Sequence, residues 1–420
     1  MIQKISVLFF CIVFVSFIPL TEYPIDGYAS TGIRRLDRLE QIQKGNIKGT
    51  LPVKGALKPL SEIQLNLLGE PGELLSAFPE PDPELQKALN RLFLNMHESY
   101  SIALLDITPG RPFAYAQRQE TRGFQPGSVG KLAVITGFMN ELAKIYPRCF
   151  DARVDVMRTR FVRAGRWAMS DEHTVPFWNP EAQKLIKRQV AEKDVFSLYE
   201  WCDHMLSVSN NGAASVCWRE AVLMRAFCKE YATLTEERAD EYFKNTPKGE
   251  LSDLALAVIN DALVALGITT DEWRLGTFFT RGAGTYIPSK GGSNGTPVGL
   301  MKWMIALERG MVVDQESSLE IKRLLYMTDR RIRYAANKSL DDAAVYFKSG
   351  SLYGCQPEEG YQCAKYKGNT KNFMNSVAII EHPDSTIYMV ALMSNVLRKN
   401  SNIDHNALAG NIDKIIRARK

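Results

Sequence analysis

The stretch Ser128-Val129-Gly130-Lys131 is followed further along the chain by Ser209-Asn210-Asn211 and then by Lys348-Ser349-Gly350. These three motifs have the patterns S-x-x-K, S-x-N and K-[ST]-G, and each occurs once. A serine and a lysine three positions apart arise easily by chance, so one motif alone is weak evidence. The order of the three motifs and their local contexts together predict one shared site. The fold must therefore bring the three motifs together.

The first motif follows the chain-breaking Pro126-Gly127 and opens an apolar run that predicts a helix over residues 132–145. Residues three apart lie on one face of a helix, so the Lys131 amine can reach the Ser128 hydroxyl. A serine needs a base to become a nucleophile, and a lysine serves only where burial or a second cation lowers its pKa. We predict Ser128 as nucleophile and Lys131 as base. The plainer interpretation is a polar helix start with a solvated lysine.

The second motif lies in a polar turn between an apolar segment and a run of small residues. Ser209 is predicted to pass a proton to the leaving group, and the Asn211 amide to bind both Lys131 and a substrate amide. The same letters also suit a helix N-cap with turn-forming asparagines. The presence of the other two motifs in the same chain favours the catalytic interpretation.

The third motif follows a β-prone run, so it is expected on an edge strand beside the site. Lys348 and Ser349 are predicted to hold a substrate carboxylate, and Gly350 to let substrate approach the backbone closely. The Ser351 N–H is expected to complete an oxyanion hole that the helix start at Ser128 begins. An edge-strand lysine that discourages aggregation explains the same residue without a site.

Strands are predicted near both ends of the chain and helices in the middle. Alternating and β-branched runs predict strands at residues 100–107, 113–117, 344–349, 375–381 and 386–394. Apolar periodicity and flanking signals predict helices at residues 84–95, 132–145, 194–206, 212–231, 297–309 and from about 407 onward. Short connections favour antiparallel pairing, so we expect an α/β (α+β) protein. Its antiparallel sheet would be flanked by helices and joined to an all-helical lobe at about 132–300.

The bulk composition is that of an ordinary globular protein, with 420 residues, 45% hydrophobic residues and a net charge of +5. This charge is too small and diffuse to indicate a nucleic-acid partner. Asp171-Glu172-His173 lacks a second histidine at helical spacing, and no cysteine pair has metal-ligand spacing. We therefore expect no metal and no cofactor.

Residues 1–20 carry a cation and then an apolar run, which is typical of an export signal. We predict a signal peptide over residues 1–30 and a periplasmic or secreted protein. An uncleaved anchor is the alternative, because the run has the minimum length of a membrane span. Residues 31–83 end in proline-rich sequence and are interpreted as an N-terminal extension or linker. Export permits disulfides, and Cys355 and Cys363, which close a short loop, are the first pair to expect.

Residues 84–420 resemble the class A β-lactamase-like group of penicillin-recognising serine hydrolases. The resemblance rests on the three motifs, on the predicted hairpin before Pro126-Gly127, and on Thr296-Pro297 at the start of a predicted helix. The resemblance implies an acyl-enzyme mechanism, in which Ser128 attacks a strained or activated amide and water later releases the product. It also implies a small-molecule β-lactam or a D-Ala-D-Ala-type peptide as substrate, and association with the cell envelope.

The chain departs from that family in one respect. Class A β-lactamases carry a Glu-x-x-Leu-Asn loop whose glutamate activates the deacylating water, whereas residues 275–288 contain no acid here, and Asp271 and Glu272 lie just upstream. We therefore expect acylation of Ser128 with slow deacylation. A D,D-peptidase or esterase acting on cell-wall peptides or small esters remains open, as does a non-catalytic penicillin-binding or sensor module.

Overall fold

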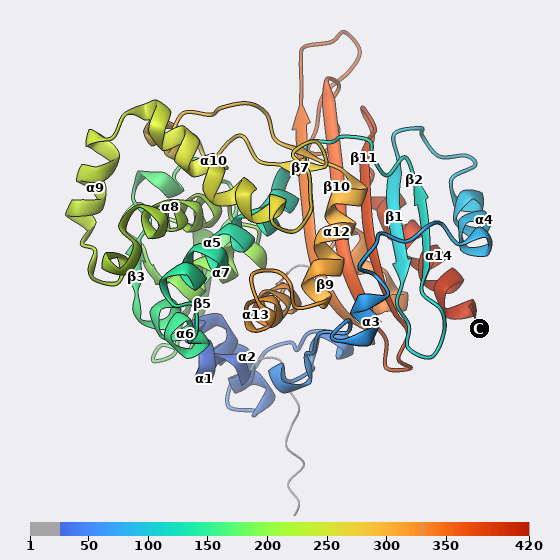
Figure 1. Ribbon diagram of the computed structural model, residues 1–420, viewed down its shortest axis with the longest axis horizontal. Helices are drawn as coiled ribbons and strands as arrows, with labels where there is room; N and C mark the ends of the chain where they lie inside the picture. The colour runs from blue at the N-terminus through green and yellow to red at the C-terminus, as the bar shows by residue number, and fades with distance from the viewer. Residues whose placement is uncertain (1–25, 330, 420) are drawn as a thin grey trace, which may run out of the picture.

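A five-stranded antiparallel sheet forms the centre of one lobe, with strand order β2-β1-β11-β10-β9 (Figure 1). The computed structural model describes residues 26–329 and 331–419. The strands are β1 (Ser101–Asp106), β2 (Ala114–Arg118), β9 (Ala344–Gly354), β10 (Lys371–Glu381) and β11 (Ile387–Asn395). All five predicted strands are present, and the sheet with its flanking helices confirms the expected fold class.

The two faces of the sheet contribute to two hydrophobic cores. On β1, Ala103 and Leu105 join the core toward the helical lobe, whereas Ile102 and Leu104 join the opposite core. That opposite face is covered by α4 (Pro83–Leu92) and α14 (Asn402–Ala418) (Figure 1). Because side chains alternate with a period of two, a one-residue slip in register would exchange the two cores. The register of β9, and so the position of the third motif, is fixed by this burial.

The second lobe is mainly helical and lies on the left in Figure 1. Its helices are α5 (Lys131–Ile145), α6 (Phe150–Thr159), α7 (Leu198–Leu206), α8 (Asn211–Phe227), α9 (Glu236–Asn245) and α10 (Lys248–Val264). Helix α5 is apolar on nearly all sides because the other helices surround it. The lobe also holds two antiparallel pairs that the sequence analysis did not predict, β3 (Phe161–Arg163) with β6 (Val195–Ser197) and β4 (Thr174–Asn179) with β5 (Lys184–Gln189).

The remaining elements connect the helical lobe to the sheet. They are β7 (Trp273–Arg274), α11 (Arg281–Tyr286), β8 (Asn294–Gly295), α12 (Pro297–Glu308) and α13 (Gln315–Tyr326). Helix α12 begins at Pro297 as predicted, with the Thr296 hydroxyl accepting a hydrogen bond from Gly299 N. Helices α11 and α13 were not predicted.

The N-terminal segment, residues 26–82, runs from the helical lobe along the sheet to α4 (Figure 1). It contains α1 (Gly27–Thr31), α2 (Arg34–Gln43) and α3 (Glu70–Glu73), and its buried Ile33 and Leu67 belong to the main core. The buried Arg35 guanidinium makes two 2.7 Å hydrogen bonds to the Asp203 carboxylate on α7. The division at residue 83 stays a prediction, but this segment packs against both lobes.

The predicted signal peptide falls mostly on residues 1–25, which lie outside the described residues, so export stays a prediction. Within residues 26–329 and 331–419, none of the helices combines the length and apolarity that crossing a bilayer requires.

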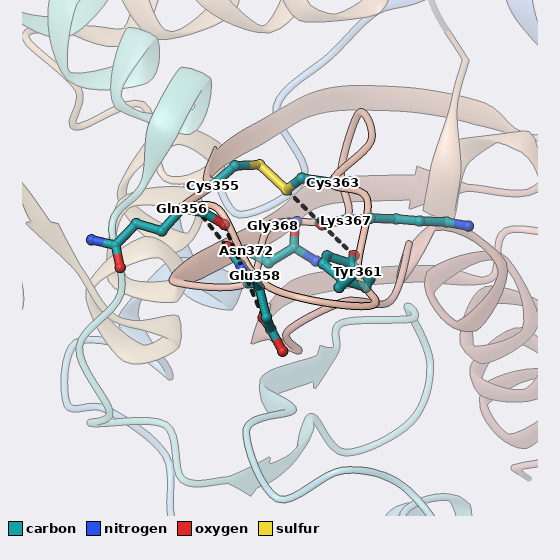
Figure 2. Close-up of a disulfide and its surroundings, with 9 residues drawn as sticks. Cys355, Gln356, Glu358, Tyr361, Cys363, Lys367, Gly368 and Asn372 are labelled. Carbon is teal, nitrogen blue, oxygen red and sulfur yellow. Dashed lines mark hydrogen bonds between the residues drawn. A yellow bond between two sulfur atoms is a disulfide. The ribbon is translucent and has the colours of Figure 1, made fainter.

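The connection between β9 and β10 is closed by a disulfide between Cys355 and Cys363, which confirms the predicted pair (Figure 2). The Tyr361 hydroxyl donates a 2.6 Å hydrogen bond to the Lys367 carbonyl inside this loop. The Gly368 N–H donates to Asn372 Oδ1 on β10 at 3.1 Å. We refer to residues 355–370 as the disulfide loop.

Candidate active site

Ser128 lies in the 3-10 turn Gly127–Gly130, directly before α5. Gly127 has a φ of +53°, a left-handed conformation that glycine adopts readily. Lys131 is the first residue of α5, and its Nζ lies 2.9 Å from Ser128 Oγ. The i,i+3 spacing thus places the amine against the hydroxyl, as the sequence predicted.

Lys131 also joins the first motif to the second. Its fully buried side chain donates from Nζ to the Ser209 carbonyl at 2.6 Å and to Asn211 Oδ1 at 2.6 Å, and lies 3.3 Å from Ser209 Oγ. The Phe279 ring lies 5.2 Å from the same nitrogen. Polar atoms therefore surround Lys131 on the serine side and an aromatic ring closes another side.

The second motif forms the turn between α7 and α8. Ser209 has a φ of +62°, an unfavourable conformation for a residue with a Cβ, held by the hydrogen bond from Lys131 to its carbonyl. Asn210 Oδ1 caps α8 by accepting from Ala213 N at 2.6 Å. This turn therefore does both things that the sequence suggested. Asn210 caps the helix, and Ser209 and Asn211 contact Lys131.

The third motif reaches the same turn from the sheet. The buried Lys348 side chain donates from Nζ to Ser209 Oγ at 2.8 Å and to the Ser349 carbonyl at 3.1 Å. The Ser209 hydroxyl consequently contacts two amines, one from each lobe.

Gly350 is required by the chain's own packing. A Cβ at this position would lie 2.2 Å from the Pro126 carbonyl oxygen and 2.8 Å from Val129 N. Asn375 on β10, which pairs with Gly350 on β9, donates from Nδ2 to the Gln125 and Pro126 carbonyls at 2.9 and 3.0 Å. The glycine lets β9 approach the Ser128 turn, and the predicted approach of substrate at this residue stays a prediction.

Two adjoining cavities expose these residues. The larger, about 510 Å³, is lined by Ser128, Asn211 and Ser351 among others. The smaller, about 40 Å³, is lined by Ser128, Ser209, Lys348, Ser349, Gly350 and Ser351. Lys131 lies beneath Ser128 and lines neither cavity. The structure therefore brings all eight sequence-predicted site residues together at one cleft, which we call the Ser128 cleft.

His173 also lines this cleft, with Asp171 buried behind it, although in the sequence the two formed only part of a rejected metal motif. Asp171 accepts from Asn211 N at 2.6 Å and from Asn211 Nδ2 at 3.1 Å. Burial opposes ionisation of Asp171, but hydrogen bonds and positive charge from His173, with a contribution from Lys131, outweigh it and lower its pKa below the ordinary value. One of the two Asn211 amide protons thus goes to Asp171.

Arg333 is a third side chain that the sequence did not reveal. It has a φ of +56°, is 5% exposed, and donates from one guanidinium nitrogen to the Gly350 carbonyl at 2.6 Å. Its guanidinium lies 5.2 Å from the Tyr366 ring of the disulfide loop. Burial lowers its pKa, and no carboxylate among residues 26–329 and 331–419 forms a salt bridge with it. Arg333 and Lys348 therefore make the small cavity a place for an anion.

Residues 275–288, the stretch without an acidic residue, form one wall of the cleft. The residues of this stretch that line the cleft are Leu275, Thr277, Phe278 and Phe279. Upstream, Glu272 makes a 2.6 Å salt bridge with Lys302, and the Asp271 side chain is fully exposed. Neither lines the two cavities. Among the described residues that do, Glu172 is the one carboxylate.

Residues 179–417, more than half of the chain, match the beta-lactamase enzyme family. Among solved structures, the TLA-3 extended-spectrum beta-lactamase is 12% identical with a TM-score of 0.52, over 79% of this chain and 97% of that one. A beta-lactamase from Chitinophaga pinensis DSM 2588 is 12% identical with a TM-score of 0.50, over 80% and 97%. No curated protein matches the chain.

The structural likenesses extend over more of the chain than the family match, which begins after Ser128 and Lys131. At 12% identity they concern the fold alone. The fold and the matched residues are those of β-lactamase-like proteins. On this evidence the chain belongs to the beta-lactamase enzyme family.

Proposed function

We propose that the protein is an exported serine hydrolase that forms an acyl-enzyme on Ser128 with a β-lactam or a related acyl amide. The observation that carries the proposal is the position of Lys131 Nζ, 2.9 Å from Ser128 Oγ in a fully buried setting. A serine hydroxyl within hydrogen-bond reach of a buried amine is the arrangement that activates a nucleophile.

The acylation step uses both lobes. Lys131, as a neutral amine, accepts the Ser128 proton while Oγ attacks the amide carbonyl carbon. Two ammonium groups around one buried hydroxyl would repel each other, which favours a neutral amine at one of the two lysines. We expect the N–H groups of Ser128 and Ser351 to stabilise the oxyanion. Ser209, between Lys131 and Lys348, relays the proton to the leaving nitrogen.

The substrate is expected to carry a carboxylate. Lys348 and Arg333 both line the small cavity beside Ser128, and a buried guanidinium without a carboxylate partner among the described residues binds an anion strongly. Both a β-lactam and a D-Ala-D-Ala-type peptide carry a carboxylate close to the reactive amide. The choice between a β-lactamase, a D,D-peptidase or esterase and a slowly acylated sensor then depends on deacylation.

Labelling with a fluorescent penicillin tests the nucleophile. Ser128→Ala is expected to abolish covalent labelling, and Lys131→Ala to slow it by roughly 10²-fold or more, the range for losing a catalytic base. Unchanged labelling of the Ser128→Ala variant would remove the proposed nucleophile. Circular dichroism establishes that both variants are folded.

Substrate turnover separates the three activities. Rapid hydrolysis of a chromogenic cephalosporin supports a β-lactamase, and release of D-alanine from a D-Ala-D-Ala peptide without cephalosporin hydrolysis supports a D,D-peptidase. A long-lived adduct with one penicillin per chain supports a sensor. Localisation of the tagged protein in envelope and cytoplasmic fractions tests export.

A further inference from the structure

The cleft contains an aspartate–histidine pair that the acylation step does not use. His173 lines both the larger and the smaller cavity, as Ser128 does, and no other histidine among residues 26–329 and 331–419 lines either of them. Its side chain is 30% exposed, whereas that of Asp171 is 4% exposed. The histidine thus faces the cleft and the carboxylate lies behind it.

The hydrogen bonds fix the orientation of the imidazole. His173 Nδ1 donates to Asp171 Oδ1 at 2.7 Å, and a carboxylate can only accept there, so Nδ1 carries a proton. In the neutral ring, Nε2 is then the nitrogen that accepts a proton. The His173 backbone is held as well, because its carbonyl accepts from Asn210 Nδ2 at 3.0 Å.

We propose that His173 is the general base of deacylation, with Asp171 as the residue that positions it. This inference rests on the proposed acyl-enzyme function and supplies the role of the acid that residues 275–288 lack. His173 Nε2 takes a proton from water as the water oxygen attacks the ester carbonyl carbon. When the bond between that carbon and Ser128 Oγ breaks, the proton returns to Oγ, leaving free serine and a carboxylic acid.

The residues that line the cleft indicate the side from which water would attack the ester. Leu275 and Phe279 lie against Gly130, where an added Cβ would meet their side chains at 2.8 and 3.4 Å. This wall is mainly apolar, with Thr277 as a polar exception, so it offers water few hydrogen-bonding partners. Glu172 and His173, in the loop directly before β4, also line the cleft, and they supply polar groups that can hold a water molecule.

Charged or titratable groups on several neighbouring elements lie in or beside the cleft that His173 lines. They are Asp171 and Glu172 on its own loop, Lys131 on α5, Lys348 on β9, Arg333 after α13, and Lys365 with Tyr366 on the disulfide loop. The nearest is the Asp171 carboxylate, in direct contact. Deacylation requires the neutral His173 ring. The deacylation rate of the wild type should therefore rise with pH as the imidazole loses its proton, and the rate of variants without this ring should not.

Single-turnover kinetics tests the inference. The protein is acylated with a penicillin, excess reagent is removed, and the acyl-enzyme is followed by intact-mass spectrometry across pH. We expect His173→Gln to be acylated at close to the wild-type rate but to deacylate at least about 100-fold more slowly, the lower end for losing a general base. The rising limb of the pH profile should be absent. Asp171→Asn should slow deacylation less, since the ring remains.

Three further variants distinguish a base from a structural role. Added imidazole should restore deacylation in His173→Ala, which a structural histidine would not allow. Glu172→Gln identifies the other candidate base, and His97→Gln, in the connection between α4 and β1, is the control. Fast deacylation in His173→Gln, or its loss in Glu172→Gln alone, would overturn the inference. Failure of wild-type Ser128 to acylate would instead refute the proposed function, and this inference with it.

Discussion

Lys348 reaches from the sheet to the helical lobe and donates to Ser209, with its Nζ 2.8 Å from Ser209 Oγ. Lys131 approaches the same hydroxyl to 3.3 Å from α5. Because Ser209 Oγ contacts both amines, it is the atom through which the three sequence motifs meet. In the proposed acylation, a proton that leaves Ser128 through Lys131 would pass through this hydroxyl to the leaving group.

Removing this hydroxyl should impair acylation more than folding. Ser209→Ala is expected to slow acylation of Ser128 by roughly 10²-fold or more, because the relay to the leaving nitrogen is lost. The measurement is the rate of labelling by a fluorescent penicillin, with Ser339→Ala in the remote turn before β9 as the control. Wild-type labelling of Ser209→Ala would show that the proton travels by another route.

A methyl group at Gly350 should displace the nucleophile. The built Cβ lies 2.2 Å from the Pro126 carbonyl oxygen, so β9 and the Ser128 turn must separate. Gly350→Ala is expected to abolish labelling and to lower Tm. Gly249→Ala on α10, where nothing lies within 4 Å of the added Cβ, should be neutral or stabilising by about 0.5–1 kcal/mol. Equal behaviour of the two variants in thermal unfolding and labelling would contradict this packing role.

Opening the Cys355–Cys363 disulfide should weaken substrate binding while leaving the chemistry intact. The disulfide loop carries Lys365 and Tyr366, which line the Ser128 cleft, and the Tyr366 ring contacts Arg333. In the double Cys→Ser variant we expect KM to rise with kcat nearly unchanged. The free energy of unfolding should fall by about 2 kcal/mol, since the closed loop is short.

Cys149→Ser is the matched control for that variant, because Cys149 is an exposed cysteine outside the disulfide. Its KM and unfolding free energy should equal those of wild type. A fall in kcat in the double variant, with KM unchanged, would mean that the loop acts on the chemical step instead.

His405 should make the protein less stable in acid. Its ring lies fully buried between Ser376 Oγ at 3.0 Å and Ser394 Oγ at 3.1 Å, and burial, together with the charge of Arg333, lowers its pKa to about 3. The unfolded chain binds this proton near pH 6.5, so the stabilisation is complete above that pH and is lost as the pH falls toward 3.

Denaturant unfolding at two pH values measures this effect. Between pH 7.5 and pH 5, wild type should lose about 2 kcal/mol more than His405→Gln, which keeps a polar side chain without a titratable ring. Equal losses in the two proteins would mean that other groups dominate the acid sensitivity.

The sequence revealed those parts of the site that depend on local spacing. Ser128 and Lys131 are one helical turn apart, and the strand before Lys348 has a clear β pattern, so their positions followed from short stretches. Asp171, His173 and Arg333 reach the cleft through contacts with segments far away in the chain. Nothing in their immediate neighbours marks those contacts.

Two differences in the fold have similar causes. The N-terminal segment has a weak local pattern, yet buried Leu36 and the Arg35–Asp203 ion pair fasten it to the main core. Gly350 was interpreted through a substrate, whereas the structure shows the Pro126 turn against it. Propensity and spacing describe a residue's own element, and tertiary packing decides what lies opposite it.

Intact-mass spectrometry of wild type and Ser128→Ala after exposure to a penicillin tests the central claim most directly. We expect that wild type gains the mass of one intact penicillin, located by peptide mapping on Ser128, and that the variant gains none. An adduct of equal yield on both proteins, or attachment at another residue, would contradict it.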